Sequence, residues 1–367
     1  MKVACVVGAR PNFMKIAPVI DAMRAHPRLT PFLIHTGQHY DAAMYKVFFE
    51  DLGLPRPDVY LGVGSDTQGR QTARIMSEFE GLCEEHKPDY VLVVGDVNST
   101  MAAAVVAVKL RIRTGHVESG LRSYDRDMPE EINRLVTDAI SDDLFTSCAD
   151  AAPNLIKEGV DPSRIHFVGN VMIDSLVKHR DRAKASPVLG DLGLEPRGYL
   201  LVTLHRPSNV DDPDTFKRLI GALGRLSQEK PVIFPVHPRT RARLGEFGLG
   251  GFLDSHPGLR LVDPLGYLDF LKLMDNTALV VTDSGGIQEE TTYLGVPCLT
   301  ARRNTERPVT VTEGTNRLIG VDPEAIVEAG LEVLHGAPVE GRIPELWDGK
   351  AAERIAAKLN AFAEDNG

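Results

Sequence analysis

A glycine turn between an apolar run and a helical pattern is the stretch of this chain that most clearly predicts a ligand. The β-branched run Leu279–Thr282 is followed by Asp283 and then by Ser284-Gly285-Gly286, after which a helical pattern begins. Such a turn leaves free backbone N–H groups at the positive end of a helix dipole, and glycines let a phosphate approach the backbone closely. Glu290 follows within the helical pattern and can reach sugar hydroxyls. The stretch indicates either a ligand with a phosphate and a polyol, such as a nucleotide sugar, or an ordinary strand-to-helix loop.

Three acidic residues lie where other apolar runs end. Asp96 and Glu118 come just after two such runs, and Glu130 stands at the start of a helical pattern. Each has a structural alternative, because Asp96 can cap a helix and acidic residues favour helix starts. His116 and Glu118, two apart on a strand, share a face and can form a hydrogen bond, an acid/base pair or, less readily, a metal pair that lacks a third ligand at a familiar spacing. Three carboxylates at neighbouring strand ends are nevertheless more than capping requires.

Basic and aromatic side chains follow other runs. Arg10 and Lys15, after the first run, can both meet a phosphate or can be solvent-facing cations of a capped turn. His205 and Arg206 follow a run in the second half, and such a pair can bind a phosphate and donate a proton. Phe270 can lie against a flat base, although one Phe at helical spacing is typical of a core.

The sequence around these residues predicts a fold of alternating strands and helices that would hold them in place. Short β-branched runs alternate with longer helical patterns, which indicates parallel sheets joined by right-handed crossovers. The strands predicted in a first series are Val3–Val7, Phe32–Thr36, Tyr90–Val94, Arg113–Val117, Leu144–Thr146 and Ile165–Val168. Those of a second series are Tyr199–Thr203, Val232–Val236, Leu259–Val262, Leu279–Thr282 and Cys298–Thr300. Helical patterns lie near 14–25, 41–51, 67–86, 99–110, 130–141, 212–228, 240–246, 267–274, 286–294 and 323–334.

Two series of strands predict two domains, as the length of 367 residues also does. We expect an α/β protein with two Rossmann-like, doubly wound domains, residues 1–169 and 170–349, although the polar stretch 178–186 is another place for the join. A helix over about 350–367 can pack back on the first domain, which periodicity does not decide. Ligands of such folds bind at the carboxyl ends of the strands, so two facing sheets would place the site in the cleft between them.

Composition excludes several classes of protein. The chain is 43% hydrophobic and 25% charged, as soluble globular proteins are, and its net charge of −10 argues against a nucleic-acid partner. Its four cysteines show no metal spacing, which favours a reduced, cytoplasmic protein. The hydrophobic run at the N-terminus is too short for a signal peptide, and we expect no membrane segment.

A series of motifs makes the prediction specific. In order along the chain stand GARPN with Lys15, TGQHYD, GD, HVESGLRS, MPEEINR, GNVMID, TLHRPSN, PLGYLDFLKLM, TDSGGIQEE, NTERP and GTNRLIG. Over roughly residues 5–320 the sequence resembles the non-hydrolysing UDP-N-acetylglucosamine 2-epimerases. The resemblance implies two Rossmann-like domains of GT-B type facing across a cleft and the interconversion of UDP-GlcNAc and UDP-ManNAc. It also implies a UDP-N-acetylhexosamine substrate, a homodimer formed through the first domain, and no metal or other cofactor.

The resemblance assigns roles to the residues found above. It implies that Asp96, Glu118 and Glu130 are the acid/base set and that His205 assists departure and return of the phosphate. The residues it implies for the rest of the substrate are Arg10, Lys15 and the Ser284, Gly285 and Gly286 amides for the phosphates, Glu290 for the ribose, Phe270 near uracil, and Arg307 and Arg317 on the phosphate side.

Bacterial members of that family often carry a regulatory UDP-GlcNAc site. The positions matching it here are Gln38, His39, Arg70, Arg206 and His237. Two departures from the family pattern bear on these loops: Ser208 stands where many members have Glu, and Asp41 replaces a Gln. Allosteric activation by the substrate therefore stays open.

The chemistry of C2 inversion fits the resemblance. Oxidation by NAD would need a dinucleotide fingerprint, but Gly62-Val63-Gly64 continues to Thr67 where the third glycine should stand. Elimination of UDP to 2-acetamidoglucal and its re-addition needs carboxylates and a cationic hold on the diphosphate, and the sequence has both. The alternatives are a hydrolysing epimerase that releases ManNAc and UDP, a 2-epimerase of a modified UDP-N-acetylhexosamine, a GT-B glycosyltransferase and an inactive nucleotide-sugar sensor.

Overall fold

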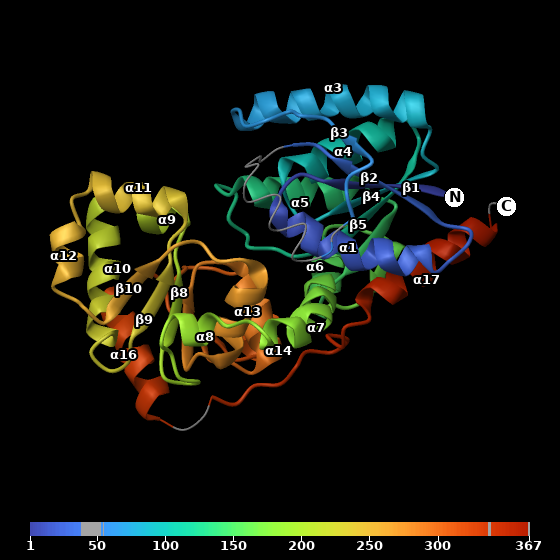
Figure 1. Ribbon diagram of the computed structural model, residues 1–367. Coiled ribbons are helices and arrows are strands. Elements are labelled where there is room, and N and C mark those ends of the chain that lie inside the picture. The colour runs from blue at the N-terminus through green and yellow to red at the C-terminus, as the bar shows by residue number, and fades with distance from the viewer. Residues whose placement is uncertain (38–52, 54, 337–338, 366–367) are drawn as a thin grey trace. The chain divides into compact units, whose positions relative to one another are not determined.

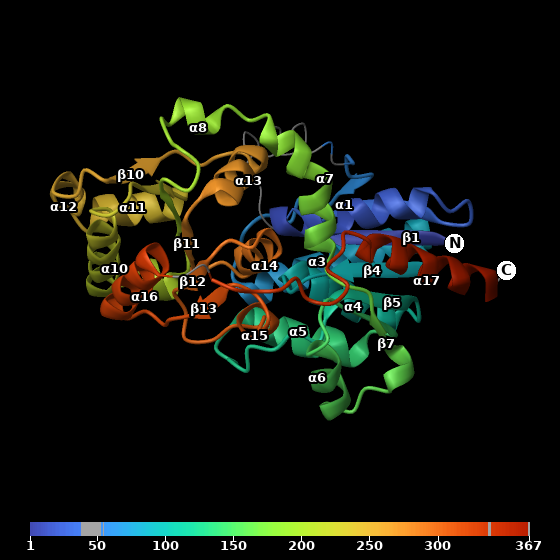
Figure 2. The same ribbon diagram turned by 90° about the horizontal axis from the view of Figure 1, so that it is seen from below.

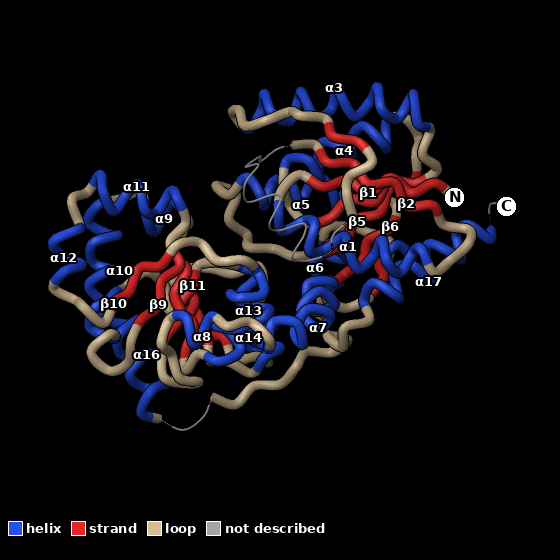
Figure 3. Tube along the Cα trace, viewed as in Figure 1, coloured by secondary structure: helices blue, strands red, loops and turns tan. Residues whose placement is uncertain are grey.

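The chain forms two compact units, each built around its own parallel sheet (Figure 3). A computed structural model describes residues 1–37, 53, 55–336 and 339–365, without the side chains of residues 10, 238, 239 and 365. Unit 1 comprises Met1–Lys178 and Glu345–Gly367, and unit 2 comprises His179–Pro344. Two doubly wound, Rossmann-like units confirm the predicted α/β class.

Unit 1 contains a seven-stranded parallel sheet in the order β3-β2-β1-β4-β5-β6-β7. Its strands are β1 (Lys2–Val7), β2 (Thr30–His35), β3 (Val59–Tyr60), β4 (Tyr90–Val94), β5 (Arg113–Ser119), β6 (Asp143–Thr146) and β7 (Ile165–Phe167). The central strands are almost wholly apolar because helices cover both faces of the sheet.

The helices of unit 1 lie on both sides of this sheet (Figure 1). They are α1 (Arg10–Arg24), α3 (Gln68–His86), α4 (Asn98–Lys109), α5 (Pro129–Ile140), α6 (Ala151–Lys157), the 3₁₀ turn η1 (Pro162–Arg164), the first part of α7 (Val171–Lys184), which continues into unit 2, and α17 (Ala351–Asp365). Helices α3, α4 and α5 pack side by side on one face, and α17 lies along α1 on the other (Figures 1 and 2).

Unit 2 repeats the plan with a six-stranded parallel sheet in the order β10-β9-β8-β11-β12-β13. Its strands are β8 (Leu200–Thr203), β9 (Val232–Pro235), β10 (Leu259–Val262), β11 (Leu279–Thr282), β12 (Cys298–Thr300) and β13 (Asn316–Leu318). Its helices are α8 (Val188–Asp191), α9 (Pro207–Val210), α10 (Pro213–Leu226), α11 (Pro238–Glu246), α12 (Gly250–Asp254), α13 (Tyr267–Asn276), α14 (Gly285–Leu294), α15 (Val309–Thr312) and α16 (Pro323–His335).

Amphipathic helices close the core of unit 2. Helix α10 begins at a standard signal, because the Asp212 side chain accepts from the backbone N–H of Thr215 and Pro213 occupies the first turn. It buries Phe216 and Leu219 against the sheet, each contributing about 1.5–3 kcal/mol. Helices α10 and α16 cover one face of the sheet, while α14 packs on the other.

The strand order reverses once in each sheet, and these reversals place the loops of interest. In unit 1 the chain turns one way after β1 and the other way after β4, and in unit 2 the same holds for β8 and β11. Ligands of doubly wound folds bind outside the carboxyl ends of the strands at such switch points. The loops that leave these four strands begin at Gly8, Gly95, Leu204 and Asp283.

The structure corrects the predicted elements at a few places. Strands β3 and β13 were not predicted. The division between the two units falls between Lys178 and His179, at the start of the polar stretch considered as a join, and it lies within α7, which runs to Lys184. The helical pattern expected near 41–51 lies outside the described residues.

The C-terminal segment is built into unit 1. Trp347 is almost fully buried, and its Nε1 donates to the backbone oxygen of Ser147 at 2.8 Å. Asp174 of α7 accepts from the backbone N–H groups of Ala351 and Ala352 at 3.2 and 2.7 Å, which caps the start of α17. Unit 1 is therefore made of two separate stretches of chain.

All four cysteines are buried free thiols. Burial raises the pKa of Cys83 to about 11 and that of Cys298 to about 12, so both stay protonated and unreactive at neutral pH. Among the described residues, no helix combines the length and apolar character needed to cross a bilayer.

Candidate active site

Asn12 ties together the two loops at the switch point of unit 1. Its Oδ1 accepts from the backbone N–H of Ala9 at 3.0 Å, and its Nδ2 donates to the backbone oxygen of Val94 at 2.9 Å. The asparagine thus joins the first turn of α1 to the end of β4. Arg10 begins α1, but its side chain is outside the described part of the chain.

Glu118 occupies an irregular position in β5. The register between β5 and β6 shifts between Val117 and Ser119, and Glu118 has a left-handed φ of 73°. A non-glycine residue held in this region is strained, and such strain gathers at functional sites. The bulge aims the buried Glu118 carboxylate at Lys15 Nζ, with which it forms an ion pair. Lys15, expected at a phosphate, is thus paired with a carboxylate that was expected to act on the sugar.

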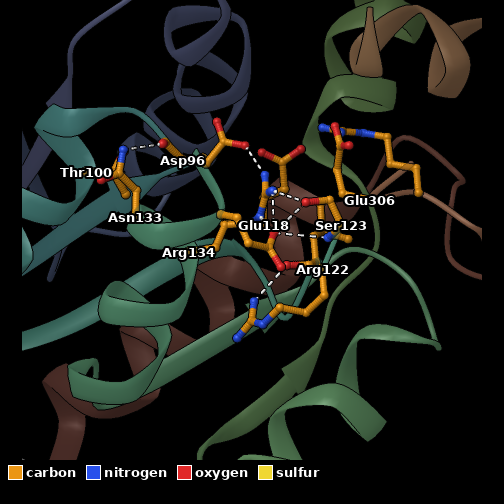
Figure 4. Close-up of polar contacts among 12 residues, drawn as sticks. Asp96, Thr100, Glu118, Arg122, Ser123, Asn133, Arg134 and Glu306 are labelled. Carbon is orange, nitrogen blue, oxygen red and sulfur yellow. Dashed lines mark hydrogen bonds and ion pairs between the residues drawn. The ribbon is translucent and has the colours of Figure 1, made fainter. Parts of the chain in front are cut away.

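Asp96 is held by a buried arginine that the sequence did not reveal. Arg134 of α5 donates to Asp96 Oδ2 at 2.5 Å and is itself fully buried (Figure 4). The same guanidinium makes two contacts with Glu131 Oε2, at 3.0 and 2.6 Å. Figure 4 shows the Arg134 side chain between Asp96 and Ser123. Asp96 keeps part of its surface exposed, 26% of the side chain, and remains accessible to a ligand.

Glu131 holds the loop that follows β5. Its carboxylate accepts from the Ser123 N–H and hydroxyl at 3.0 Å each and from the Tyr124 N–H at 2.9 Å. Burial by itself raises the pKa of Glu131, but these donors together with Arg134 hold it below its usual value. Glu131 is therefore structural, whereas the preceding Glu130 is half-buried and, within the described residues, makes no hydrogen bond or ion pair.

His116 is a buried support rather than a free acid or base. Its Nδ1 lies 2.6 Å from Asp138 Oδ1 and its Nε2 lies 2.8 Å from the backbone oxygen of Gly95. Arg122 pairs with Asp138 at 2.7 Å, and burial of Asp138 is outweighed by His116 and Arg122, which lower its pKa. Asp138 is then ionised, so the two atoms that His116 contacts, Asp138 Oδ1 and the Gly95 oxygen, are both acceptors. The expected His116–Glu118 pairing is replaced by this network, which fixes the Gly95 carbonyl next to Asp96.

The corresponding loops of unit 2 are organised by Asp283. Its Oδ2 accepts from the backbone N–H groups of His205 and Arg206 at 2.9 and 2.8 Å and from Asn209 Nδ2 at 3.0 Å. His205 Nδ1 lies 2.9 Å from the other oxygen, Oδ1. The His205 side chain is 47% exposed, so one end of the ring is fixed and the other faces outward.

The glycine turn stands beside a buried arginine. Ser284 precedes α14, and its N–H is held by Thr282 Oγ1 at 3.0 Å. A Cβ at Gly285 would lie 2.4 Å from Arg307 Nη1 and 2.7 Å from Glu306 Oε1, so a larger residue there requires the end of the Arg307 or Glu306 side chain to shift. Arg307 also pairs through Nε with Glu289 at 2.8 Å. The structure therefore brings Arg307 to the predicted anion turn, and Gly286 continues that turn as the second residue of α14.

Glu290 and Phe270 belong to helices that pack against each other, α14 and α13. Tyr267 donates its hydroxyl to Glu290 Oε1 at 2.7 Å; Glu290 is buried and Tyr267 is half-buried. Burial raises the pKa of Glu290 to about 7, although the Tyr267 hydrogen bond opposes that rise. Phe270 is half-buried in the first turn of α13.

Arg317 is not brought to the glycine turn. Its guanidinium is 46% exposed and pairs with Glu332 of α16 at 2.8 Å, on the opposite face of the sheet from α14. The neighbouring Asn316 points the other way and donates to Gln288 of α14 at 3.2 Å. Since successive strand residues face opposite sides, the residue of this motif that faces α14 is Asn316.

The residues expected at a regulatory site are only partly described. Gln38 and His39 lie outside the described residues. Arg70 is exposed in the first turn of α3. Arg206 Nε donates to the backbone oxygen of Asp283 at 2.9 Å. The centroids of the His237 and His205 rings lie 6.4 Å apart.

Sequence reasoning missed the residues that hold others in place. Arg134, Asp138 and Asp283 are buried partners of predicted site residues, and no spacing rule connects position 134 with 96 or 283 with 205. The only signal was an unusual density of charged residues within the motifs. Among the described residues, no group of three His, Cys, Asp or Glu side chains gathers closely enough to hold a metal ion.

The chain is similar to known proteins over most of its length. The family model for UDP-N-acetylglucosamine 2-epimerase matches residues 21–360. A UDP-N-acetylglucosamine 2-epimerase of Methanococcus maripaludis is 44% identical over 91% of this chain and 92% of its own. The crystal structure of the Methanocaldococcus jannaschii UDP-GlcNAc 2-epimerase with UDP-GlcNAc and UDP is 41% identical, covers 98% of this chain and 100% of its own, and superposes with a TM-score of 0.91. The UDP-2,3-diacetamido-2,3-dideoxy-D-glucuronate 2-epimerase of Pseudomonas aeruginosa is 40% identical over 98% of this chain and 99% of its own.

Proposed function

The chain belongs to the UDP-N-acetylglucosamine 2-epimerase family, and we propose that it interconverts UDP-GlcNAc and UDP-ManNAc without hydrolysis. The observation that carries the proposal is the set of three carboxylates in unit 1. Asp96, Glu118 and Glu130 follow β4, end β5 and begin α5, and only the first two have a cation partner in the described structure. Three acids in different surroundings suit a reaction that both removes and returns a proton.

The proposed reaction is an elimination followed by re-addition. One carboxylate takes the proton from C2, the C1–O bond breaks, and UDP leaves behind 2-acetamidoglucal. UDP then adds back at C1 while C2 receives a proton on the opposite face. The reaction balances without an oxidant, and electrostatic stabilisation of the leaving diphosphate lowers its barrier.

We assign the leaving group to the turn of unit 2. The Gly285 and Gly286 amides stand at the positive end of α14 and suit a phosphate, whereas the Ser284 amide is already held by Thr282 Oγ1 at 3.0 Å. His205 projects from the neighbouring loop, and Arg307 lies next to Gly285. Glu290 is proposed to receive the ribose hydroxyls and Phe270 to lie near uracil.

In unit 1, Arg10 and Lys15 complete the proposed set of phosphate and sugar contacts. Lys15 is already paired with Glu118, so its first role in the proposal is to hold that carboxylate. Arg317 is left out because its side chain faces α16.

A second substrate deserves equal testing. The Pseudomonas aeruginosa relative that epimerises a diacetamido uronate is 40% identical, close to the 41% of the structure with bound UDP-GlcNAc. The substituents at C3 and C6 of the sugar are therefore the open part of the substrate assignment. Parallel assays with UDP-GlcNAc and UDP-2,3-diacetamido-2,3-dideoxyglucuronate decide between the two by the larger kcat/KM.

Incubation with UDP-GlcNAc in D2O, without added cofactor, tests the reaction itself. We expect deuterium at C2 and the appearance of UDP-ManNAc in the NMR spectrum. Free ManNAc and UDP as the products would instead show a hydrolysing enzyme. Intact, unexchanged UDP-GlcNAc would reject this substrate, and the modified sugar would then be the candidate.

We also propose that the substrate UDP-GlcNAc regulates the enzyme and that the chain forms a homodimer. If Gln38, His39, Arg70, Arg206 and His237 form a regulatory site, epimerisation of UDP-ManNAc will need a trace of UDP-GlcNAc to start. A progress curve without a lag would reject such a site.

The homodimer is tested by sedimentation, which should give twice the 40.1 kDa mass of the chain.

A further inference from the structure

Asp283 is a buried carboxylate surrounded by donors. It is fully shielded from solvent and follows the central strand β11. Its Oδ2 accepts three hydrogen bonds, from the His205 and Arg206 backbones and from the Asn209 side chain. Burial of this carboxylate raises its pKa, but the His205 ring and the two backbone N–H groups lower it further, so the group is ionised.

The other oxygen, Oδ1, faces only the imidazole. His205 Nδ1 lies 2.9 Å from Oδ1 as an ion pair, and among the described residues Oδ1 accepts no hydrogen bond of regular geometry. An ionised carboxylate can only accept, so the nitrogen beside it must carry a hydrogen. A carboxylate behind an imidazole fixes both its tautomer and its orientation.

We propose that Asp283 is a positioning residue that keeps the hydrogen of His205 on Nδ1, so that Nε2 is the nitrogen that exchanges a proton with the departing diphosphate. The inference rests on the proposed function for the role of Nε2, and on the geometry alone for the tautomer.

The proton exchange balances with the elimination. A carboxylate takes the C2 proton, and the C2–H electron pair forms the C1=C2 double bond. The C1–O pair passes to the β-phosphate oxygen, which takes the proton from Nε2 of the imidazolium. Re-addition returns that proton to Nε2. Throughout, the hydrogen stays on Nδ1 and faces Asp283 Oδ1.

Asp283→Asn tests the proposal because it should reverse the tautomer. The three donors around Oδ2 select the amide oxygen of the new side chain, which turns its NH₂ group toward His205 Nδ1. Nδ1 must then accept, and the hydrogen of the neutral ring moves to Nε2. The backbone contacts of the loop are retained, so the change is confined to the ring.

The tautomer is measured directly by long-range ¹H–¹⁵N correlation of ¹⁵N-histidine-labelled enzyme, at a pH where the ring is neutral. His205→Asn assigns the signals. We expect hydrogen on Nδ1 in the native enzyme and on Nε2 in Asp283→Asn. Hydrogen on Nε2 in the native enzyme, or the same tautomer in both, would overturn the proposal.

Kinetics supply the second readout. We expect Asp283→Asn to lower kcat about 10²-fold or more, with a smaller change in KM. The double variant Asp283→Asn/His205→Asn should be no slower than His205→Asn, because Asp283 acts through the ring. Additive losses would mean that Asp283 acts elsewhere.

Thr203→Val is the matched control for simple damage to this strand end. It removes a hydrogen bond of 2.7 Å between Thr203 and Thr282 hydroxyls in adjacent strands, without touching the ring. Thr203→Val should lower the unfolding temperature and leave the tautomer unchanged, whereas a tautomer change there would assign the effect to loss of structure. If the native chain does not epimerise UDP-GlcNAc, the proposed function fails, but the tautomer measurement still decides whether Asp283 sets the ring.

Discussion

The acidic residues of unit 1 differ in what holds them. Asp96 contacts Arg134, Glu118 contacts Lys15 through a strained backbone, and Glu130 has neither. The sequence predicted the positions of the three acids, because each follows or begins a recognisable element. It could not predict their partners, since a buried contact between α5 and the end of β4 leaves no periodic trace.

Arg134 is expected to be the most sensitive of these partners. Arg134→Met leaves Glu131 buried without its cation, which should lower the free energy of unfolding by about 3–5 kcal/mol. It also releases Asp96, and a displaced catalytic group costs about 10² in kcat. Denaturant unfolding and steady-state kinetics measure the two effects.

Arg225→Met is the control for Arg134→Met, because it breaks an exposed ion pair with Glu324 in unit 2. We expect stability and kcat to stay near those of the native enzyme. Equal losses in both variants would show that removal of any arginine, rather than loss of the Asp96 partner, explains the result.

Glu290 should make stability depend on pH. Burial raises its pKa from 4.5 to about 7, so between these values the folded state holds a proton that the unfolded state has lost. The contribution of Glu290 to the free energy of unfolding is therefore greatest below pH 4.5, and it falls by about 3 kcal/mol as pH rises to 7 and above. Glu290→Gln should remove that part of the fall, and denaturant unfolding between pH 5 and 8 measures it. Parallel curves for the two proteins would contradict the assignment.

At the scale of elements, buried parallel strands were the easiest to predict. Tyr90–Val94 and Leu279–Thr282 have the predicted bounds because both faces of a central strand are covered and nearly every residue is apolar. The missed strands β3 and β13 lie at sheet edges, where a strand needs few residues and no apolar run. The bulge in β5 was also missed, because a bulge depends on the register with β6.

The start of α14 can be tested with two glycines of the same unit. Gly285→Ala places a Cβ 2.4 Å from Arg307 Nη1, which must move, whereas a Cβ at Gly251 meets nothing within 4 Å. We expect Gly285→Ala to weaken UDP binding at least about tenfold, since it displaces Arg307 from the proposed phosphate site, and Gly251→Ala to leave it unchanged. Calorimetric titration with UDP measures both, and unaltered affinity in Gly285→Ala would reject the turn as the phosphate site.

At the scale of the whole chain, one unit is continuous in sequence and the other is not. Unit 2 is a single stretch of chain, whereas unit 1 also includes the residues that follow unit 2. Periodicity predicted an amphipathic helix at the C-terminus but not its place, because the caps from Asp174 join positions nearly 180 residues apart.

Truncation of the chain after Pro344 should therefore destabilise unit 1 and leave the stability of unit 2 unchanged. The truncated chain lacks buried Trp347 and α17, and loss of one such side chain costs about 3–5 kcal/mol. Hydrogen exchange should show lost protection in α1 and α7 and native protection in α10 and β11. A chain that lacks only residues 366–367 is the control, and equal loss in both units would contradict the division.

Trp347 also confines the tryptophan fluorescence of the molecule to unit 1. It is the single tryptophan of the chain and lies buried in unit 1, with its indole N–H on Ser147. Fluorescence excited at the red edge of the protein absorption band consequently follows the integrity of unit 1, while unit 2 contributes no indole emission. Unfolding followed by emission and by circular dichroism should coincide only if the two units melt together, so one native chromophore can report whether they do.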